Sequence, residues 1–77
     1  MGNDQILLEP ERGHADWYRF TFTSRDGKLT GRVSIALEGR PDNRTREEKM
    51  RAARIKVEYL AHAFYAAATE SRYAHQP

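Results

Sequence analysis

The stretch Thr45–Glu70, TREEKMRAARIKVEYLAHAFYAAATE, decides the fold of this chain. Between Lys49 and Thr69 it contains neither glycine nor proline, and it is rich in Ala, Arg, Glu and Lys, which favour helices. Thr45 and Glu48 have the spacing of a capping box, in which each side chain accepts a hydrogen bond from the backbone amide of the other residue. The pattern predicts one long helix that begins after Thr45 and ends near residues 70–73.

At about 100° per residue, the apolar side chains of this helix fall on two nearly opposite sides. The first side, expected to pack on the sheet, comprises Met50, Ala53, Val57, Leu60, Ala61, Phe64, Ala67 and Ala68. The second side comprises Ile55, Tyr59, Ala63 and Ala66, with His62 at its margin. A helix that is apolar all round is normally buried all round.

A chain of 77 residues has little structure left with which to cover the second side. We therefore predict a protein interface made by Ile55, Tyr59, His62, Ala63 and Ala66, with Tyr65 and Tyr73 at its border. The alternative is that Ile55 and Tyr59 are ordinary exposed apolar residues, because such residues are common on protein surfaces. Contiguous apolar patches, however, usually mark contact sites.

Residues 17–38 predict an antiparallel β-hairpin. Trp17–Thr23 is aromatic and β-branched with alternating polarity, Asp26-Gly27 favours a two-residue type I′ turn, and Leu29–Glu38 resumes the alternation. With this turn, both strands place their large apolar residues on the same face. The pairs in this register are Phe22 with Gly31, Phe20 with Val33, and Tyr18 with Ile35.

The run Ile6–Glu9, stopped by Pro10, is a candidate third strand. The predicted fold class is therefore α+β, with a β-hairpin or three-stranded antiparallel sheet packed on one long C-terminal helix (β-β-α). Twenty-five helical residues span roughly 37 Å, whereas strands of eight or nine residues span roughly 28 Å. We expect the helix to extend past its own sheet at its alanine- and aromatic-rich end.

Size and composition place the chain among small single domains, which we assign to residues 1–77 with frayed ends at residues 1–5 and 72–77. The absence of cysteine means that neither a disulfide nor a thiolate-bound metal can supplement the core. Self-association is another way to stabilise so small a protein, and we predict a homodimer. No apolar run approaches the roughly 20 residues of a membrane span, and no signal-peptide core is visible. We predict a cytoplasmic protein without a membrane partner.

Basic residues gather at the junction between the second strand and the helix, although the net charge is only +2. On the open face of the hairpin, Trp17 lies beside Arg19 and Arg32. A second hypothesis is therefore nucleic-acid binding. Its contacts would be Trp17, Arg19, Arg32, Arg40, Arg44, Arg46, Arg51 and Arg54. The alternatives are that the arginines are solvated or meet an acidic protein partner, and that Trp17 packs under the N-terminal segment.

The sequence contains no motif that indicates catalysis. There is no cysteine nucleophile, no Gly-x-Ser-x-Gly elbow and no phosphate-binding glycine loop. His62 follows Glu58 by one helical turn, which is typical of an ordinary surface pair, whereas a catalytic metal site needs about three protein ligands. We expect no enzyme activity, no cofactor and no small-molecule substrate.

The first functional hypothesis is therefore a small, homodimeric, non-enzymatic protein-interaction module that binds a macromolecular partner. A third hypothesis is a phage-type inhibitor, anti-defence or antitoxin-like, that occupies a nucleic-acid site on a larger complex. The order strand–turn–strand–helix occurs in many small accessory proteins of bacteria and phages. That analogy rests on architecture, which does not carry function.

Overall fold

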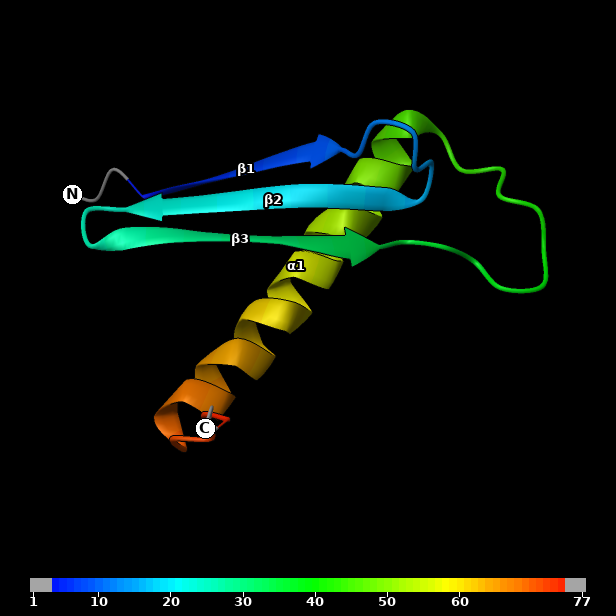
Figure 1. Cartoon of the computed structure of the whole chain (residues 1–77). Helices are drawn as coiled ribbons and strands as arrows, with labels where there is room; N and C mark the ends of the chain where they lie inside the picture. Colours follow the sequence, from blue (N-terminus) through cyan, green and yellow to red (C-terminus); the bar gives the residue numbers. More distant parts are fainter. Residues whose placement is uncertain (1–3, 75–77) are drawn as a thin grey trace.

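The structure is a computed structural model that describes residues 4–74. Three strands, β1 (Gln5–Pro10), β2 (Trp17–Ser24) and β3 (Gly27–Ser34), form an antiparallel sheet in the order β1-β2-β3. One helix, α1 (Arg46–Thr69), crosses one face of this sheet (Figure 1). The predicted α+β class is confirmed, and the candidate third strand is present as β1.

Within residues 4–74, no helix has an apolar stretch that could cross a lipid bilayer. The frayed ends predicted at residues 1–5 and 72–77 fall partly outside the described residues, and Gln5 is the first residue of β1.

Hydrogen bonds define both ends of α1. The amide of Glu48 donates to the Thr45 hydroxyl (3.1 Å), and the amide of Thr45 donates to the Glu48 carboxylate (2.8 Å), so the predicted capping box is confirmed. At the other end, Ser71 has a left-handed φ of 57°, and the amide of Arg72 donates to the carbonyl of Ala67 (2.9 Å). These are features of a Schellman motif. The 24 residues of α1 span about 36 Å, close to the predicted length.

The predicted register of the β2–β3 hairpin is wrong by two residues. Phe20 pairs with Gly31, and the connecting residues are Arg25-Asp26 rather than Asp26-Gly27. Arg25, Asp26 and Gly27 all have a negative φ, so the type I′ turn does not form. The turn is held instead by a hydrogen bond from the amide of Asp26 to the hydroxyl of Ser24 (3.1 Å). A shift of two residues leaves every side chain on its predicted face, because side chains alternate with a period of two.

The strand β3 also ends earlier than predicted, at Ser34 instead of Glu38. The amide of Ile35 donates to the carbonyl of Asp16 (2.8 Å), in the loop before β2. The chain then leaves the sheet and reaches the helix through residues 36–45 (Figure 1).

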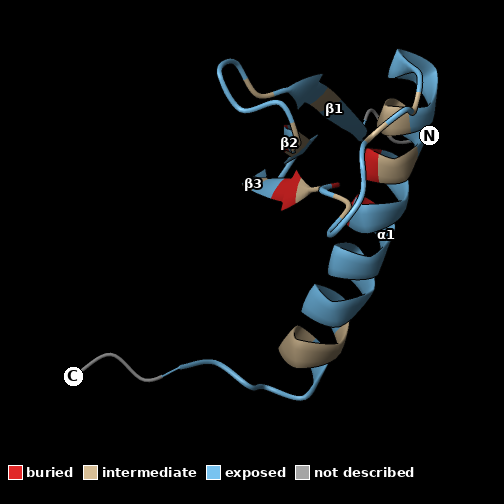
Figure 2. Ribbon diagram, turned by 90° about the vertical axis from the view of Figure 1, so that its right-hand side faces the viewer, coloured by how far each residue is buried: buried red, intermediate tan, exposed pale blue. Residues whose placement is uncertain are grey.

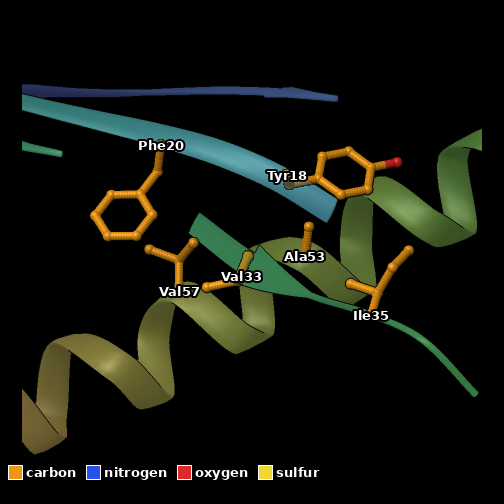
Figure 3. Close-up of a cluster of buried hydrophobic side chains, with 6 residues drawn as sticks. All are labelled: Tyr18, Phe20, Val33, Ile35, Ala53 and Val57. Carbon is orange, nitrogen blue, oxygen red and sulfur yellow. The ribbon is translucent and has the colours of Figure 1, made fainter. Parts of the chain in front are cut away.

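The hydrophobic core is small and lies under one end of the sheet. Its buried residues are Tyr18, Phe20, Val33, Ile35, Ala53 and Val57, shown in Figure 3. Both helical members belong to the first half of α1. Leu8, Met50 and Ala52 are partly buried against this cluster.

The predicted core side of α1 is therefore correct in its first half and wrong in its second. Leu60, Ala61 and Phe64 are exposed. The reason is the direction of the helix: α1 crosses the strands obliquely, so its second half extends past β3 (Figures 1 and 2). Periodicity identified the side of the helix that faces the sheet but not the point at which the sheet ends.

Gly31 tests the hairpin register, because the ring of Phe20 occupies the space that a side chain at position 31 would need. A Cβ atom there would lie 2.6 Å from Cζ of Phe20, which is buried. We expect Gly31→Ala to destabilise the fold by about 1–3 kcal/mol in urea unfolding, as overpacked cores do. Gly27→Ala is the matched control, because nothing lies within 4 Å of its Cβ position. Equal stability of the two variants would contradict the observed pairing.

Candidate functional site

An apolar groove lies in the angle between the sheet and the second half of α1. Its volume is about 450 Å³. The lining residues come from all three strands and the helix: Ile6, Phe20, Phe22, Leu29, Thr30, Val57, Leu60, Ala61 and Phe64. Thr30 is the one polar residue among them. The groove exists because α1 leaves the sheet after Val57, which is the last buried residue of the helix.

Large side chains at the groove are left uncovered by the chain itself. Phe64 is 57% exposed, Ile6 is 55% exposed and Leu60 is 42% exposed. Figure 2 shows how exposed residues dominate the helix beyond its contact with the sheet. Leu60 and Phe64 are predicted core residues that prove to be exposed, and no pattern in the sequence indicates Ile6 as a contact residue. The groove could have been anticipated from one feature of the sequence, because the predicted helix is longer than the predicted strands.

The interface predicted from the sequence also lies on α1. Ile55 is 44% exposed and Tyr59 is 69% exposed. His62 and Ala63 are exposed, and Ala66 is half-buried. None of these five residues lines the groove. The chain leaves this second side largely uncovered, and its contact with a partner stays a prediction.

The eight residues predicted to contact nucleic acid are divided among three parts of the structure. Trp17, Arg19 and Arg32 share the sheet face opposite the helix. Three others belong to α1, and two belong to the segment between β3 and α1. The helical residues are Arg46, Arg51 and Arg54, and the connecting residues are Arg40 and Arg44.

Arg44 is engaged inside the chain. Its Nε and Nη2 atoms donate to the two carboxylate oxygens of Asp42 at 2.9 and 2.8 Å, and Nη2 also donates to the carbonyl of Ile35 at 2.6 Å. Its backbone amide donates to Asp42 as well, at 3.1 Å. The two side chains are each 21% exposed. Arg44 therefore fastens the end of the sheet to the start of α1 and is not free to bind a phosphate.

The same contacts shift both ionisation equilibria. The side-chain and backbone hydrogen bonds from Arg44 hold the pKa of Asp42 well below its ordinary value, with a further small contribution from Lys49, whose Nζ atom lies 4.0 Å away. In return, the hydrogen bond to Asp42 raises the pKa of Arg44. The pair is charged throughout the physiological range.

The open face of the sheet carries a stacked group near the start of β2. The guanidinium carbon of Arg32 lies 4.9 Å from the ring centroid of Trp17, a cation–π contact. Nε of Arg32 lies 3.2 Å from Oε1 of Glu11, an ion pair without hydrogen-bond alignment. Trp17 is 38% exposed, so part of its ring remains accessible beside Arg32.

Neither His14 nor His62 belongs to a cluster of metal-binding side chains within the described residues. Among residues 4–74, no group of three His, Cys, Asp or Glu side chains could hold a metal ion. His14 and His62 are both exposed, and His75 lies outside the described residues. The candidate sites of this chain are therefore surfaces: the groove and the open sheet face.

Comparisons with protein-family models, with curated proteins and with solved structures find no match for this chain. Its function has to be inferred from these two surfaces.

The Asp42–Arg44 pair gives the fold a specific response to acid. Because the folded-state pKa of Asp42 is depressed from its ordinary value of 3.8, its contribution to stability is present above about pH 4 and is lost as the pH falls below it. We expect Asp42→Asn to be less stable than the wild type at pH 7 and to lose less stability between about pH 4 and pH 2. Urea unfolding at a series of pH values measures both effects.

Asp26→Asn is the control, because Asp26 is an exposed turn residue and forms no ion pair within residues 4–74. It should keep the acid response of the wild type. If Asp42→Asn also keeps that response in full, the pair does not fasten the helix to the sheet.

Proposed function

We propose that this chain is a non-enzymatic protein-interaction module that acts as a homodimer. In the dimer, the groove of each copy receives the second half of α1 from the other copy. The observation that carries the proposal is the apolar groove beside a helical segment that the chain does not cover. Exposed apolar surfaces of this kind usually mark sites of association.

A second copy supplies an occupant of suitable chemistry. From Tyr59 to Thr69, α1 contains no Asp, Glu, Lys or Arg. A second α1 can therefore enter the groove without burying an unpaired charge, which would cost several kcal/mol. Among residues 4–74 the core holds only six buried residues, so additional burial stabilises the fold as well as the complex.

A contact through the groove is compatible with two-fold symmetry. Phe64 lines the groove and also projects from the protruding half of α1, so a two-fold axis near Phe64 lets each copy place this ring in the groove of the other. Such a contact uses the same patch on both copies and closes on itself. Pairing the groove with the Ile55 and Tyr59 side would be head-to-tail and would continue into open chains.

Sedimentation equilibrium of three proteins tests the proposal: the wild type, Phe64→Glu and Tyr59→Glu. Both substitutions place a carboxylate on the exposed second half of α1, but only Phe64 lines the groove. We expect a dimer for the wild type, a monomer for Phe64→Glu, because its carboxylate would be buried in the contact, and a dimer for Tyr59→Glu. Circular dichroism should show an unchanged fold for both variants, because both residues are exposed.

Each other outcome has a defined meaning. A wild-type monomer at millimolar concentration contradicts homodimerisation. A monomer for Tyr59→Glu with a dimer for Phe64→Glu assigns the contact to Ile55, Tyr59 and their neighbours, as the sequence predicts, and removes the groove arrangement. Two monomeric variants would show that the contact extends around the helix, which the groove arrangement does not allow.

A further inference from the structure

We propose that the open face of the sheet binds single-stranded nucleic acid. Bases stack on Trp17 and on the plane of the Arg32 guanidinium, and the N–H groups of Arg19 and Arg32 bind the phosphate backbone. This face lies on the opposite side of the sheet from α1 and the groove, as the edge-on view in Figure 2 shows. The inference therefore does not rest on the proposed homodimer.

The strand register fixes the composition of this face. Arg19 of β2 pairs directly with Arg32 of β3, and in the next row on the same face Thr21 pairs with Thr30. In Figure 1 the helix lies behind the sheet and leaves this face open, and the β1–β2 loop projects on the side away from the helix (Figure 2). Leu7 of β1 pairs with Thr21 in the same row and is 58% exposed. The result is a surface of threonines and Leu7 with two arginines and one tryptophan at one end.

The positive charges of the facing Arg19 and Arg32 repel each other. Like charges directly opposite each other on neighbouring strands are destabilising. Glu11 offsets the charge of Arg32 through the 3.2 Å ion pair. Arg19 has Glu9 as its neighbour on β1, but within residues 4–74 its guanidinium forms no ion pair. A phosphate between the two arginines would relieve their repulsion and satisfy the free donors of Arg19.

The exposed tryptophan indicates which anion fits. The side chain of Arg32 is 49% exposed and that of Trp17 remains partly exposed, so the stacked pair still presents planar surface to a base. Base stacking on aromatic and guanidinium groups is characteristic of proteins that bind single strands. A purely acidic peptide such as polyglutamate would pair with the arginines but has no aromatic ring for the stack, and a duplex keeps its base faces inside the helix.

Glu9 and Glu11 lower the positive charge of the face, which limits the number of phosphates that it can bind. We expect two phosphate contacts, one for each arginine. For single strands, the logarithm of the binding constant falls with the logarithm of salt concentration by about 0.7 per phosphate contact. The expected slope is therefore about −1.4, with measurable binding confined to low salt.

Trp17 is the only tryptophan of the chain, so its fluorescence reports this face specifically. Oligo(dT) and oligo(U) of 12 nucleotides, a DNA duplex and polyglutamate are titrated into the full chain at low salt. We expect both single strands to quench Trp17, with oligo(dT) and oligo(U) distinguishing DNA from RNA preference. Absence of quenching by both, or equal binding of the duplex or of polyglutamate, would overturn the proposal.

Matched variants separate stacking from charge. Arg19→Gln should weaken oligonucleotide binding several-fold and reduce the salt slope by about 0.7, whereas Arg54→Gln makes the same charge change on α1 and should do neither. If both variants behave alike, the binding is not located on the sheet.

In an anisotropy assay with labelled oligonucleotide, Trp17→Ala should lose about tenfold in affinity and Trp17→Phe should keep most of it. Equal affinity of these two variants would contradict stacking.

Discussion

The oblique crossing of α1 over the sheet is the constraint on which the rest of the structure depends. Ala53 is fully buried where the helix meets β2 and β3, and its small side chain lets the two layers approach closely. The Arg44 pair with Asp42 and the Ile35 carbonyl fixes the place from which the helix starts. With its start and its crossing point fixed, a straight helix of 24 residues has to leave the sheet after Val57. The groove is the consequence of that departure.

The sheet separates two kinds of surface chemistry because its side chains alternate with a period of two. On the side of the helix, Phe20 and Phe22 provide apolar surface to the core and the groove. On the opposite side, Trp17, Arg19 and Arg32 provide a cationic and aromatic surface. A contact on one side therefore leaves the other accessible, and the two proposed interactions do not compete. A dimer formed through the groove would present two open sheet faces.

Local sequence signals were sufficient for the elements of this fold but not for their relative placement. The helix and its capping box follow from side chains that are neighbours in the sequence. The hairpin register does not, because alternation is unchanged by a shift of two residues and the Asp26-Gly27 signal favoured the wrong turn. The exposure of Leu60 and Phe64 depends on a crossing angle that periodicity does not contain. Likewise, the sequence shows that Arg44 is basic but not that the carbonyl of Ile35 lies within its reach.

The alanines of α1 explain how an uncovered segment can remain helical. An isolated helix of about ten residues is marginal in water, and most helices in proteins are stabilised by packing. Ala61, Ala63, Ala66, Ala67 and Ala68 lie in the half of α1 that extends past the sheet, and alanine has the highest intrinsic helix propensity. Because the first half of α1 is packed on the sheet and the second half is rich in alanine, the segment that carries Phe64 is helical before any partner binds. Association then orders little additional backbone, which lowers its entropic cost. The apolar side chains of this segment can therefore contribute most of their burial to affinity.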